Sequence, residues 1–539
     1  MLLVLLLAYT LLAFVPGVGS VPPIDRDEPR YTQASKQMLE SGDYVDIRFQ
    51  DEPRYKKPIG IYWLQAASAA IAGEGAGAPL WAYRIPSVIG GIAAVLLTVW
   101  AARAFVPFPA AVAAGFLIAA TATVGFEARV AKTDAVLLAT IVLAQGALAR
   151  IWLSQAARLP FAGWPLVFWL AVAAATLVKG PIVWLVSGLT VAALTAAGWR
   201  DRGWLRRLRI GPGLAVTALV AAPWFAAIWI ASDGAFFTQA VGTDFLGKAA
   251  TGQEGHWAPP LAHLAAFLGT GWPLSAFALL AAPAVWRLRR VPAVVFALAW
   301  AVPAWIVFEL VPTKLPHYTL PLLPAVALMA AAALFSARFD PGRRLRRAAA
   351  ALLVLVPAAI AAATVALPLA LGDAVVWPAV ALAAVAAALA FAGAGRLARS
   401  GSPPVAALGP AVAASLLLGL GVWGLALPRL DRVWLSPRLA QAARQAADCS
   451  EPTLVSVGFN EPSLVFLAGT GTRLLDPEKA VAALPALDCY TVAVDRRFAD
   501  RFQSALDRSG TRLVEAGEVI GLNISNGRAL RLRLYRPAP

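Results

Sequence analysis

The feature that most constrains the fold of this chain is a series of long apolar segments that continues to residue 427. An α-helix of about 20 apolar residues crosses the roughly 30 Å hydrocarbon core of a bilayer. Hydrophobic residues make up 60% of the sequence and charged residues 14%, compared with about 45–50% and about 25% in soluble domains. The sequence therefore predicts a mainly α-helical membrane protein. We expect about thirteen transmembrane helices, at residues 1–18, 79–102, 109–126, 134–153, 163–178, 181–198, 211–231, 259–285, 291–310, 316–336, 347–371, 374–394 and 404–427.

The net charge of +16 comes largely from arginines in short loops on one side of this predicted bundle. If the N-terminus is cytoplasmic and the segments alternate, eighteen arginines share that side: 103, 150, 158, 200, 202, 206, 207, 209, 287, 289, 290, 338, 343, 344, 346, 347, 396 and 399. The positive-inside rule places such loops in the cytoplasm. The basic charge therefore orients the protein, and we expect no nucleic-acid partner.

The same alternation divides the chain into two domains. Residues 1–427 form the transmembrane domain, in which residues 19–78 make an outer loop with two surface helices. The first helix starts near Asp27 and stops at Gly42, and the second follows Lys57-Pro58. Tyr31, Ser35, Met38 and Leu39 share a face of the first helix that suits the lipid headgroups. In a bacterium, this topology predicts a multi-pass inner-membrane protein whose outer loop and C-terminal residues are periplasmic.

Residues 428–539 are polar enough for a small soluble domain. Helical patterns at Pro437–Ala447, Pro477–Leu484 and Ala499–Ser509 alternate with strand-like runs at Thr453–Gly458, Tyr490–Val494, Arg512–Val519 and Leu530–Tyr535. This alternation predicts an α/β domain. The two cysteines of the chain, Cys449 and Cys489, both lie here. An oxidising compartment favours a disulfide between them, but two separate buried thiols fit the sequence equally well.

Charged residues and two tyrosines gather at the outer ends of the predicted helices, whereas the helix centres are mostly Ala, Leu and Val. They are Asp27, Glu28, Arg30, Tyr31, Lys57, Asp134, Lys179, Lys314 and Tyr318. Cations can hold a phosphate and a carboxylate can accept a proton from a hydroxyl. The pattern therefore indicates an enzyme that acts on a lipid-linked phosphate at the membrane surface.

Simpler roles remain open for several of these residues. Asp27 and Asp134 each stand at a predicted helix start, where an aspartate serves as a cap. Lys179 is also placed to reach lipid headgroups. The motif Asp-Glu-Pro-Arg-Tyr occurs at 27–31 and again at 51–55, which leaves open which copy is functional.

At these residues the chain resembles the membrane glycosyltransferases that include the aminoarabinose-to-lipid A transferases and, more distantly, the protein O-mannosyltransferases. The motifs that carry the resemblance span roughly residues 1–340, in the family's order: Asp27-Glu28-x-Arg30-Tyr31, Lys57-Pro58, Arg129…Asp134, Lys179-Gly180-Pro181 and Lys314-Leu315-Pro316-His317-Tyr318. The resemblance implies a GT-C-type bundle. It also implies inverting transfer of a sugar from a polyprenyl-phosphate donor on the periplasmic face.

The resemblance also implies roles for single residues. Asp27 corresponds to the catalytic aspartate, and Asp134 to a second acid of the cavity. Arg30, Tyr31, Lys57 and Tyr318 correspond to positions that line the donor-phosphate cavity, and we also assign Glu28, Lys179 and Lys314 to binding of the donor phosphate or substrate. Lys56 stands where the aminoarabinose transferases have a glutamate associated with a metal, and His256 is a weak match to its histidine partner. We therefore expect no required cofactor, and a divalent metal is doubtful.

The sequence as a whole predicts an integral-membrane glycosyltransferase that moves a sugar from a polyprenyl-phosphate donor to a lipid A-like, other lipid or glycan acceptor. The alternative is a multispan lipid or solute transporter, or a flippase. Transporters place their charged residues near the bilayer midplane, whereas most charges here lie at the outer rim. A membrane scaffold would account for the C-terminal domain but not for the clustered acids and cations.

Overall fold

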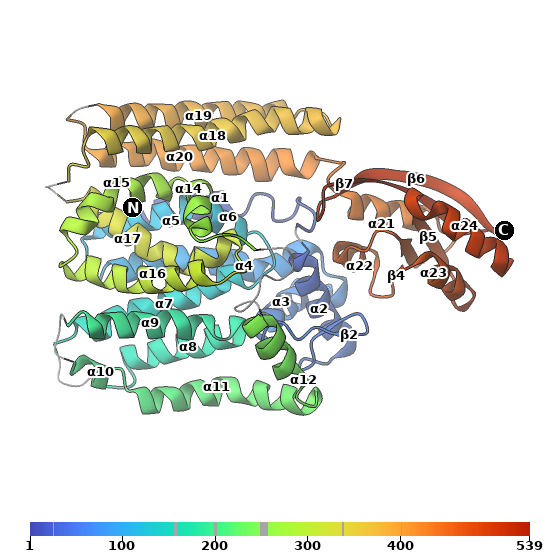
Figure 1. The fold of residues 1–539 in the computed structure, drawn as a ribbon, viewed down its shortest axis with the longest axis horizontal. Helices are drawn as coiled ribbons and strands as arrows, with labels where there is room; N and C mark the ends of the chain where they lie inside the picture. Colours follow the sequence, from blue (N-terminus) through green and yellow to red (C-terminus); the bar gives the residue numbers. More distant parts are fainter. Residues whose placement is uncertain are drawn as a thin grey trace.

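The computed structural model of the chain describes residues 1–24, 26–155, 160–198, 202–247, 257–336, 339–399 and 401–538. Most helices lie side by side in a bundle, and a domain built on a β-sheet stands beyond one end of it (Figure 1). Within the described residues, eight helices are long and apolar enough to cross a membrane, or nine if a bent pair counts as one span. The chain is therefore a multispan membrane protein, as the sequence predicted.

The long candidate spans are α4 (Leu80–Ala102), α7 (Asp134–Leu153), α10–α11 (Trp204–Arg207 and Ile210–Ala231), α16 (Pro292–Leu310), η3–α17 (Pro316–Leu322 and Leu323–Leu334), α18 (Arg343–Leu371), α19 (Trp377–Ala398) and η4–α20–η5–η6 (Pro404–Ala407, Leu408–Gly419, Leu420–Ala426 and Leu427–Arg429). The bent pair is α14 (Ala262–Thr270) with α15 (Leu274–Arg287). Four shorter apolar helices are α1 (Leu2–Phe14), α5 (Phe108–Ala120), α8 (Trp164–Lys179) and α9 (Ile182–Ala196).

Every predicted segment is thus largely helical, although 109–126 and 259–285 each contain two helices. Thirteen crossings stay a prediction. The four shorter helices have 13 to 16 residues. A helix of that length rises about 20–24 Å, less than the roughly 30 Å of hydrocarbon. What is shown is a mainly helical membrane fold with eight or nine candidate spans.

The outer loop contains the two expected helices, α2 (Asp27–Ser41) and α3 (Gly60–Ile71), together with the short strands β1 (Arg48–Phe49) and β2 (Glu52–Pro53) and the turn η1 (Gly75–Gly77). The prediction that one face of α2 lies on lipid headgroups is wrong. Tyr31 and Met38 are buried in a cluster with Trp224 of α11 and Phe236 of α12 (Ala235–Phe237). The aromatic side chains of α11 and α12 cover the face of α2 for which the sequence suggested no protein contact.

The C-terminal domain has a five-stranded mixed sheet in the order β4-β3-β5-β7-β6. Its strands are β3 (Thr453–Val457), β4 (Arg473–Leu475), β5 (Tyr490–Asp495), β6 (Leu513–Asn523) and β7 (Arg528–Pro537). β3 is parallel to β4 and β5, and β7 is antiparallel to β5 and β6. The helices are α21 (Leu435–Ala446), α22 (Pro462–Ala468), α23 (Pro477–Ala483), η7 (Leu484–Ala486), η8 (Arg496–Phe498) and α24 (Ala499–Ser509). The expected alternation is present, but α22 and β4 were missed.

Helices cover both faces of this sheet. Leu454 faces a core shared with α21 and α22, whereas the next residue, Val455, faces a core shared with α23 and α24. This alternation follows from the two-residue period of a strand. Cys449 and Cys489 form a disulfide, which settles the alternative that the sequence left open.

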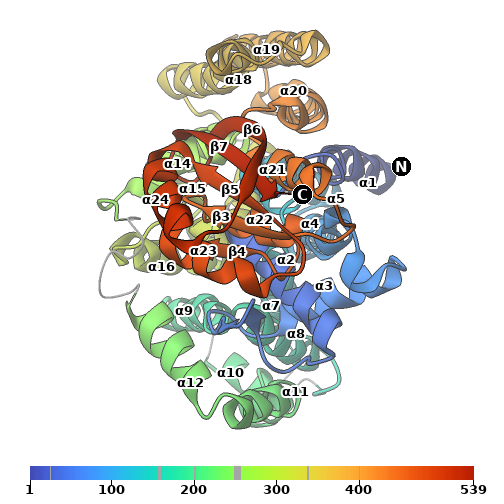
Figure 2. The same cartoon turned by 90° about the vertical axis from the view of Figure 1, so that its right-hand side faces the viewer.

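The sheet domain packs directly on the outer loop, as the view onto that end of the bundle shows (Figure 2). Gln33 of α2 donates a hydrogen bond to the hydroxyl of Thr470 at 2.8 Å, and Gln50 donates to the carbonyls of Thr470 and Thr472. Tyr83 of α4 meets Phe466 of α22 edge to face, with ring centroids 5.6 Å apart. These contacts hold α2, and with it Asp27, in a fixed place at the end of the bundle.

Candidate active site

A cavity of about 1090 Å³ lies at this end of the bundle. Of the predicted site residues, the structure places Asp27, Tyr31, Lys57, Asp134, Lys179 and Tyr318 on its wall. They come from the outer loop, α2, α7, α8 and η3. The fold therefore brings together residues that lie up to nearly three hundred positions apart in the sequence.

Two glycines allow this assembly. Gly180 ends α8 with φ +61°, a conformation that residues with a Cβ rarely adopt. It reverses the chain directly after Lys179, whose ammonium group reaches Asp134 of α7. At Gly60, a Cβ would lie 2.8 Å from the carbonyl oxygen of Leu177, so only glycine lets α3 approach α8 this closely. That approach brings the Lys57 loop to the cavity.

Asp27 is the first residue of α2, and its side chain is half-exposed. Its Oδ1 lies 3.8 Å from Nη1 of Arg30 and 3.9 Å from Nη2 of Arg54. Burial by itself raises the pKa of Asp27, but Arg54, Lys132 and the other nearby cations outweigh it and hold the pKa below its ordinary value of 3.8. The carboxylate is thus ionised at neutral pH and can accept a proton.

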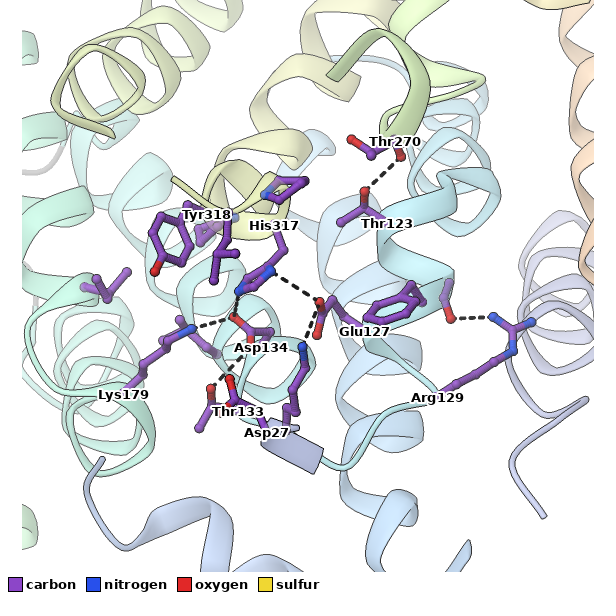
Figure 3. A pocket seen from close by; sticks show the side chains of 18 of the residues that line it. Asp27, Thr123, Glu127, Arg129, Thr133, Asp134, Lys179, Thr270, His317 and Tyr318 are labelled. Carbon is purple, nitrogen blue, oxygen red and sulfur yellow. Dashed lines mark hydrogen bonds and ion pairs between the residues drawn. The ribbon is translucent and has the colours of Figure 1, made fainter. Parts of the chain in front are cut away.

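A second group of charges lies beside Asp27, shown in close-up in Figure 3. Lys179 Nζ donates to Asp134 Oδ1 at 2.6 Å, and Lys132 Nζ lies 3.5 Å from Glu127 Oε1. The His317 ring lies between the two carboxylates, with Nδ1 3.8 Å from Glu127 Oε1 and Nε2 4.0 Å from Asp134 Oδ1. The cluster therefore links α6 (Ala122–Glu127), α7, α8 and η3.

Glu127 is the last residue of α6, beyond the apolar segment predicted at 109–126, and its side chain is buried. Burial raises its pKa to about 7, although Lys132 and Lys179 lower it. Its Oε2 has no hydrogen-bond partner among the described residues. Buried acceptors without a partner are rare in native proteins, so this carboxyl group requires a functional explanation.

Glu127, Asp134 and His317 also form the one group within the described ranges whose ligand atoms lie close enough to hold a metal ion, within 4.8 Å of one another. The ammonium groups of Lys179 and Lys132 already provide two positive charges beside the two carboxylates. A divalent cation would compete with both lysines, so the donor set is a poor fit for a resident metal. His256, the residue weakly matched to a metal ligand, lies outside the described residues.

Two predicted substrate contacts are not supported by the geometry. Glu28 is fully buried and accepts hydrogen bonds from Arg84 at 2.7 and 2.9 Å and from the backbone of Ile24 and Ala131. Lys314 Nζ donates to the carbonyls of Ala258 and Val311 at 2.9 and 2.8 Å. Neither residue is on the cavity wall. Both side chains turn toward backbone groups that the sequence could not place near them.

Arg30 is also off the cavity wall, and its guanidinium lies 3.8 Å from Asp27. Arg54 takes the place on the wall that the sequence assigned to Arg30. Its guanidinium lies 4.6 Å from the centre of the Tyr31 ring and donates to the hydroxyl of Tyr62 at 3.0 Å. Glu127, Lys132 and His317 are also on the wall, although sequence reasoning did not assign them to the site. Lys132 and His317 lie within the recognised motifs, close to Asp134 and Tyr318 in sequence. That position could have predicted that both belong to the site.

Comparison with known proteins gives a consistent result. Residues 2–232 match the family model described as dolichyl-phosphate-mannose-protein mannosyltransferase. The chain is 29% identical over 344 residues to undecaprenyl phosphate-alpha-4-amino-4-deoxy-L-arabinose arabinosyl transferase 2 of Pseudomonas fluorescens, covering 63% of this chain and 61% of that protein. The resemblance to these membrane glycosyltransferases is confirmed. The corresponding transferase of Pseudomonas aeruginosa is 30% identical over 306 residues, 56% of this chain and 54% of the relative. The match thus spans little more than half the length of these relatives.

Solved structures extend the likeness to the whole fold. ArnT from Cupriavidus metallidurans, in the apo state and bound to undecaprenyl phosphate, matches with a TM-score of 0.76 over 100% of this chain and 99% of that chain, at 19% identity. The oligosaccharyltransferase of Archaeoglobus fulgidus matches with a TM-score of 0.53 over 92% of this chain and 69% of that chain, at 14% identity. At these identities the likeness shows a common fold.

Proposed function

We propose that this protein is an integral-membrane glycosyltransferase that moves a sugar from a polyprenyl-phosphate donor to an acceptor. The observation that carries the proposal is the composition of the cavity wall. Six cations and three carboxylates line it: Arg54, Lys56, Lys57, Arg129, Lys132 and Lys179, with Asp27, Glu127 and Asp134. Such a wall favours an anion and keeps an ionised carboxylate next to it.

Much of the rest of the wall is apolar, which suits the hydrocarbon part of a lipid-linked donor. On one side lie Leu185, Phe225 and Phe237, and from elsewhere in the bundle come Ile360 and Trp423. Burial of a lipid chain is favourable by about 0.8 kcal/mol per CH₂ group. The cations would bind the phosphate of such a donor, and these apolar side chains would contact its lipid chain.

In this proposal the basic residues neutralise the phosphate, and Lys57 and Lys179 are its nearest candidates among the residues predicted from sequence. Asp27 accepts the proton of the acceptor hydroxyl while the acceptor oxygen attacks the anomeric carbon. Attack from the side opposite the phosphate inverts that carbon. Electrostatic stabilisation of the departing phosphate by fixed cations would supply much of the rate enhancement, and general base catalysis typically adds about 10²–10⁴-fold.

The names of the relatives suggest the substrates. The Pseudomonas proteins are named for undecaprenyl phosphate-alpha-4-amino-4-deoxy-L-arabinose, and one ArnT structure holds undecaprenyl phosphate. We therefore propose aminoarabinose on undecaprenyl phosphate as the donor to test first, and lipid A or a related lipid as the acceptor. We also propose that no metal is required, because Lys56 stands where the relatives' metal-associated glutamate is expected.

We further propose that the four shorter apolar helices also cross the membrane, which gives thirteen spans with the cavity and residues 428–539 on the periplasmic side of a bacterial inner membrane. The distribution of arginines among the loops supports this orientation. In this arrangement the disulfide between Cys449 and Cys489 lies in an oxidising compartment.

The decisive experiment mixes the purified protein with radiolabelled undecaprenyl-phosphate aminoarabinose and lipid A, and measures both released undecaprenyl phosphate and labelled lipid A. Asp27→Asn is the matched control because it preserves size while removing the base. Release of the lipid phosphate by the wild type but not by Asp27→Asn supports the proposal. Movement of intact donor across a vesicle membrane without release would instead support the transporter or flippase.

A further inference from the structure

Glu127 has no role in the mechanism described so far, although it lies on the cavity wall between the Lys132 ammonium and the His317 ring. Its Oε1 lies 3.5 Å from Lys132 Nζ and 3.8 Å from His317 Nδ1. Its Oε2 is buried and has no hydrogen-bond partner among the described residues. A buried carboxylate is costly when one of its oxygens accepts no hydrogen bond. A protonated carboxyl group avoids that charge and can donate a hydrogen bond to a bound substrate.

The chemistry at the phosphate creates a use for such a donor. When the bond between the anomeric carbon and the phosphate oxygen breaks, its electron pair stays on that oxygen, and the lipid phosphate becomes a dianion. The second pKa of a phosphate monoester is about 6. A dianion in a cavity partly closed to water is unfavourable, and a proton delivered to the departing oxygen would leave a monoanion instead.

We propose that Glu127 is a catalytic general acid, which donates its carboxyl proton to the departing phosphate oxygen while Asp27 accepts the proton of the acceptor hydroxyl. This proposal rests on the proposed glycosyl transfer. The acceptor oxygen forms its bond to the anomeric carbon as the carbon–phosphate oxygen bond breaks. Glu127 ends as a carboxylate beside Lys132, Asp27 ends protonated, and cavity water returns the proton from Asp27 to Glu127. The products are the glycoside and the polyprenyl phosphate monoanion, so protons and charge balance.

The environments of the two carboxyl groups agree with this division of roles. Cations hold the pKa of Asp27 below 3.8, whereas burial raises that of Glu127 to about 7. Pairs of carboxyl groups that are held apart in this way are typical of acid and base partners. A donor near pKa 7 is also closely matched to an oxygen whose conjugate acid has a pKa of about 6, which is the efficient range for proton transfer.

The titratable and charged groups that face Glu127 are known. They are Lys132 of the same loop, Asp134 at the start of α7, Lys179 of α8 and His317 of η3. Of the other helices that contact α6, α5 carries no charged residue, and Arg84 of α4 is bonded to Glu28. His317 is the neighbouring ring that contacts both carboxyl groups of the cluster, so the test must separate its contribution from that of Glu127.

The test measures kcat/KM for donor turnover between pH 5.5 and 9 for the wild type, Glu127→Gln, Glu127→Asp and His317→Asn. In the wild type, we expect kcat/KM to fall about tenfold per pH unit above about 7, because Glu127 loses its proton. Glu127→Gln should lose about 10²-fold or more at pH 6.5, abolish this alkaline fall and leave the donor KM within about threefold. Glu127→Asp should retain an alkaline fall at a shifted pH. Glu451→Gln, an exposed acid of the sheet domain, should match the wild type.

Three results would overturn the inference while leaving the glycosyl transfer intact. They are wild-type turnover by Glu127→Gln, an alkaline fall that survives in Glu127→Gln but disappears in His317→Asn, and a loss confined to donor KM. If Glu127→Gln does not fold, an unshifted alkaline fall in Glu127→Asp would overturn it equally. Absence of lipid phosphate release by the wild type would refute the proposed function itself, and the inference with it.

Discussion

Lys57 and Lys314 offer a direct test of the site, because the sequence assigned both to the donor phosphate and the structure separates them. Lys57 lies on the cavity wall. Lys314 is buried, and its ammonium donates to the carbonyls of Ala258 and Val311 at 2.9 and 2.8 Å. Replacing each lysine by alanine should therefore produce two different defects.

For Lys57→Ala, the loss is that of a charge-assisted hydrogen bond, about 1.5–3 kcal/mol. Because about 1.4 kcal/mol is a factor of ten, kcat/KM for the donor should fall by about 10–100-fold with little change in thermal stability. Lys314→Ala instead leaves two carbonyls without their donor. Leaving such a group unsatisfied costs about 1–3 kcal/mol, so the unfolding temperature should fall while donor KM stays within about threefold.

The assay combines steady-state kinetics with the donor and thermal unfolding in detergent, followed by tryptophan fluorescence. Lys479→Ala, an exposed lysine of α23, serves as the control for loss of a single positive charge. If Lys314→Ala raised the donor KM as much as Lys57→Ala and left stability unchanged, the placement of the Lys314 side chain would be refuted.

Three further predictions follow from the same geometry. Asp27→Asn should lower transfer by at least about 10²-fold without loss of fold. Because the pKa of Asp27 lies below 3.8, wild-type activity should lose this base only below about pH 4. Near-wild-type activity of Asp27→Asn together with an inactive Asp51→Asn would move the site to the second copy of the motif. Arg84→Ala should destabilise the protein by about 3–5 kcal/mol, because it leaves the buried Glu28 carboxylate without its ion pair, and a denaturant titration that found no change would contradict that role. The wild type should not react with an impermeant maleimide, because its cysteines form a disulfide. Ser41→Cys should react from outside intact cells, and Arg290→Cys should react only after the membrane is opened. The reverse pattern would place the cavity in the cytoplasm.

Local sequence determined much of the architecture. Each of the thirteen apolar segments is largely helical, because a run of apolar residues in lipid has to satisfy its backbone groups within itself. The strands and most helices of the C-terminal domain also lie where their periodicity predicted. Two segments were missed there: β4, which at 3 residues is too short to display a period, and α22.

The residues of the site were only partly predictable. Motifs found Asp27, Tyr31, Lys57, Asp134, Lys179 and Tyr318, because each stands in or beside the terminal turns of a helix and these helix ends meet at one cavity. Motifs could not tell which way a side chain turns. Lys314 and Glu28 are sequence neighbours of residues on the cavity wall. The Lys314 ammonium nevertheless donates to two backbone carbonyls, and the Glu28 carboxylate accepts a hydrogen bond from Arg84.

The sequence by itself thus determined that the chain spans a membrane, which of its ends carry charge, and the kind of chemistry those charges suit. These are properties of single segments and of their hydropathy. Only the tertiary structure decided the partners: Asp134 with Lys179, Glu127 with Lys132 and His317, and Cys449 with Cys489. Partners at such separations depend on how helices rotate and pack against one another, because one face of α2 or one turn of η3 decides whether a charged group meets the cavity or a backbone carbonyl.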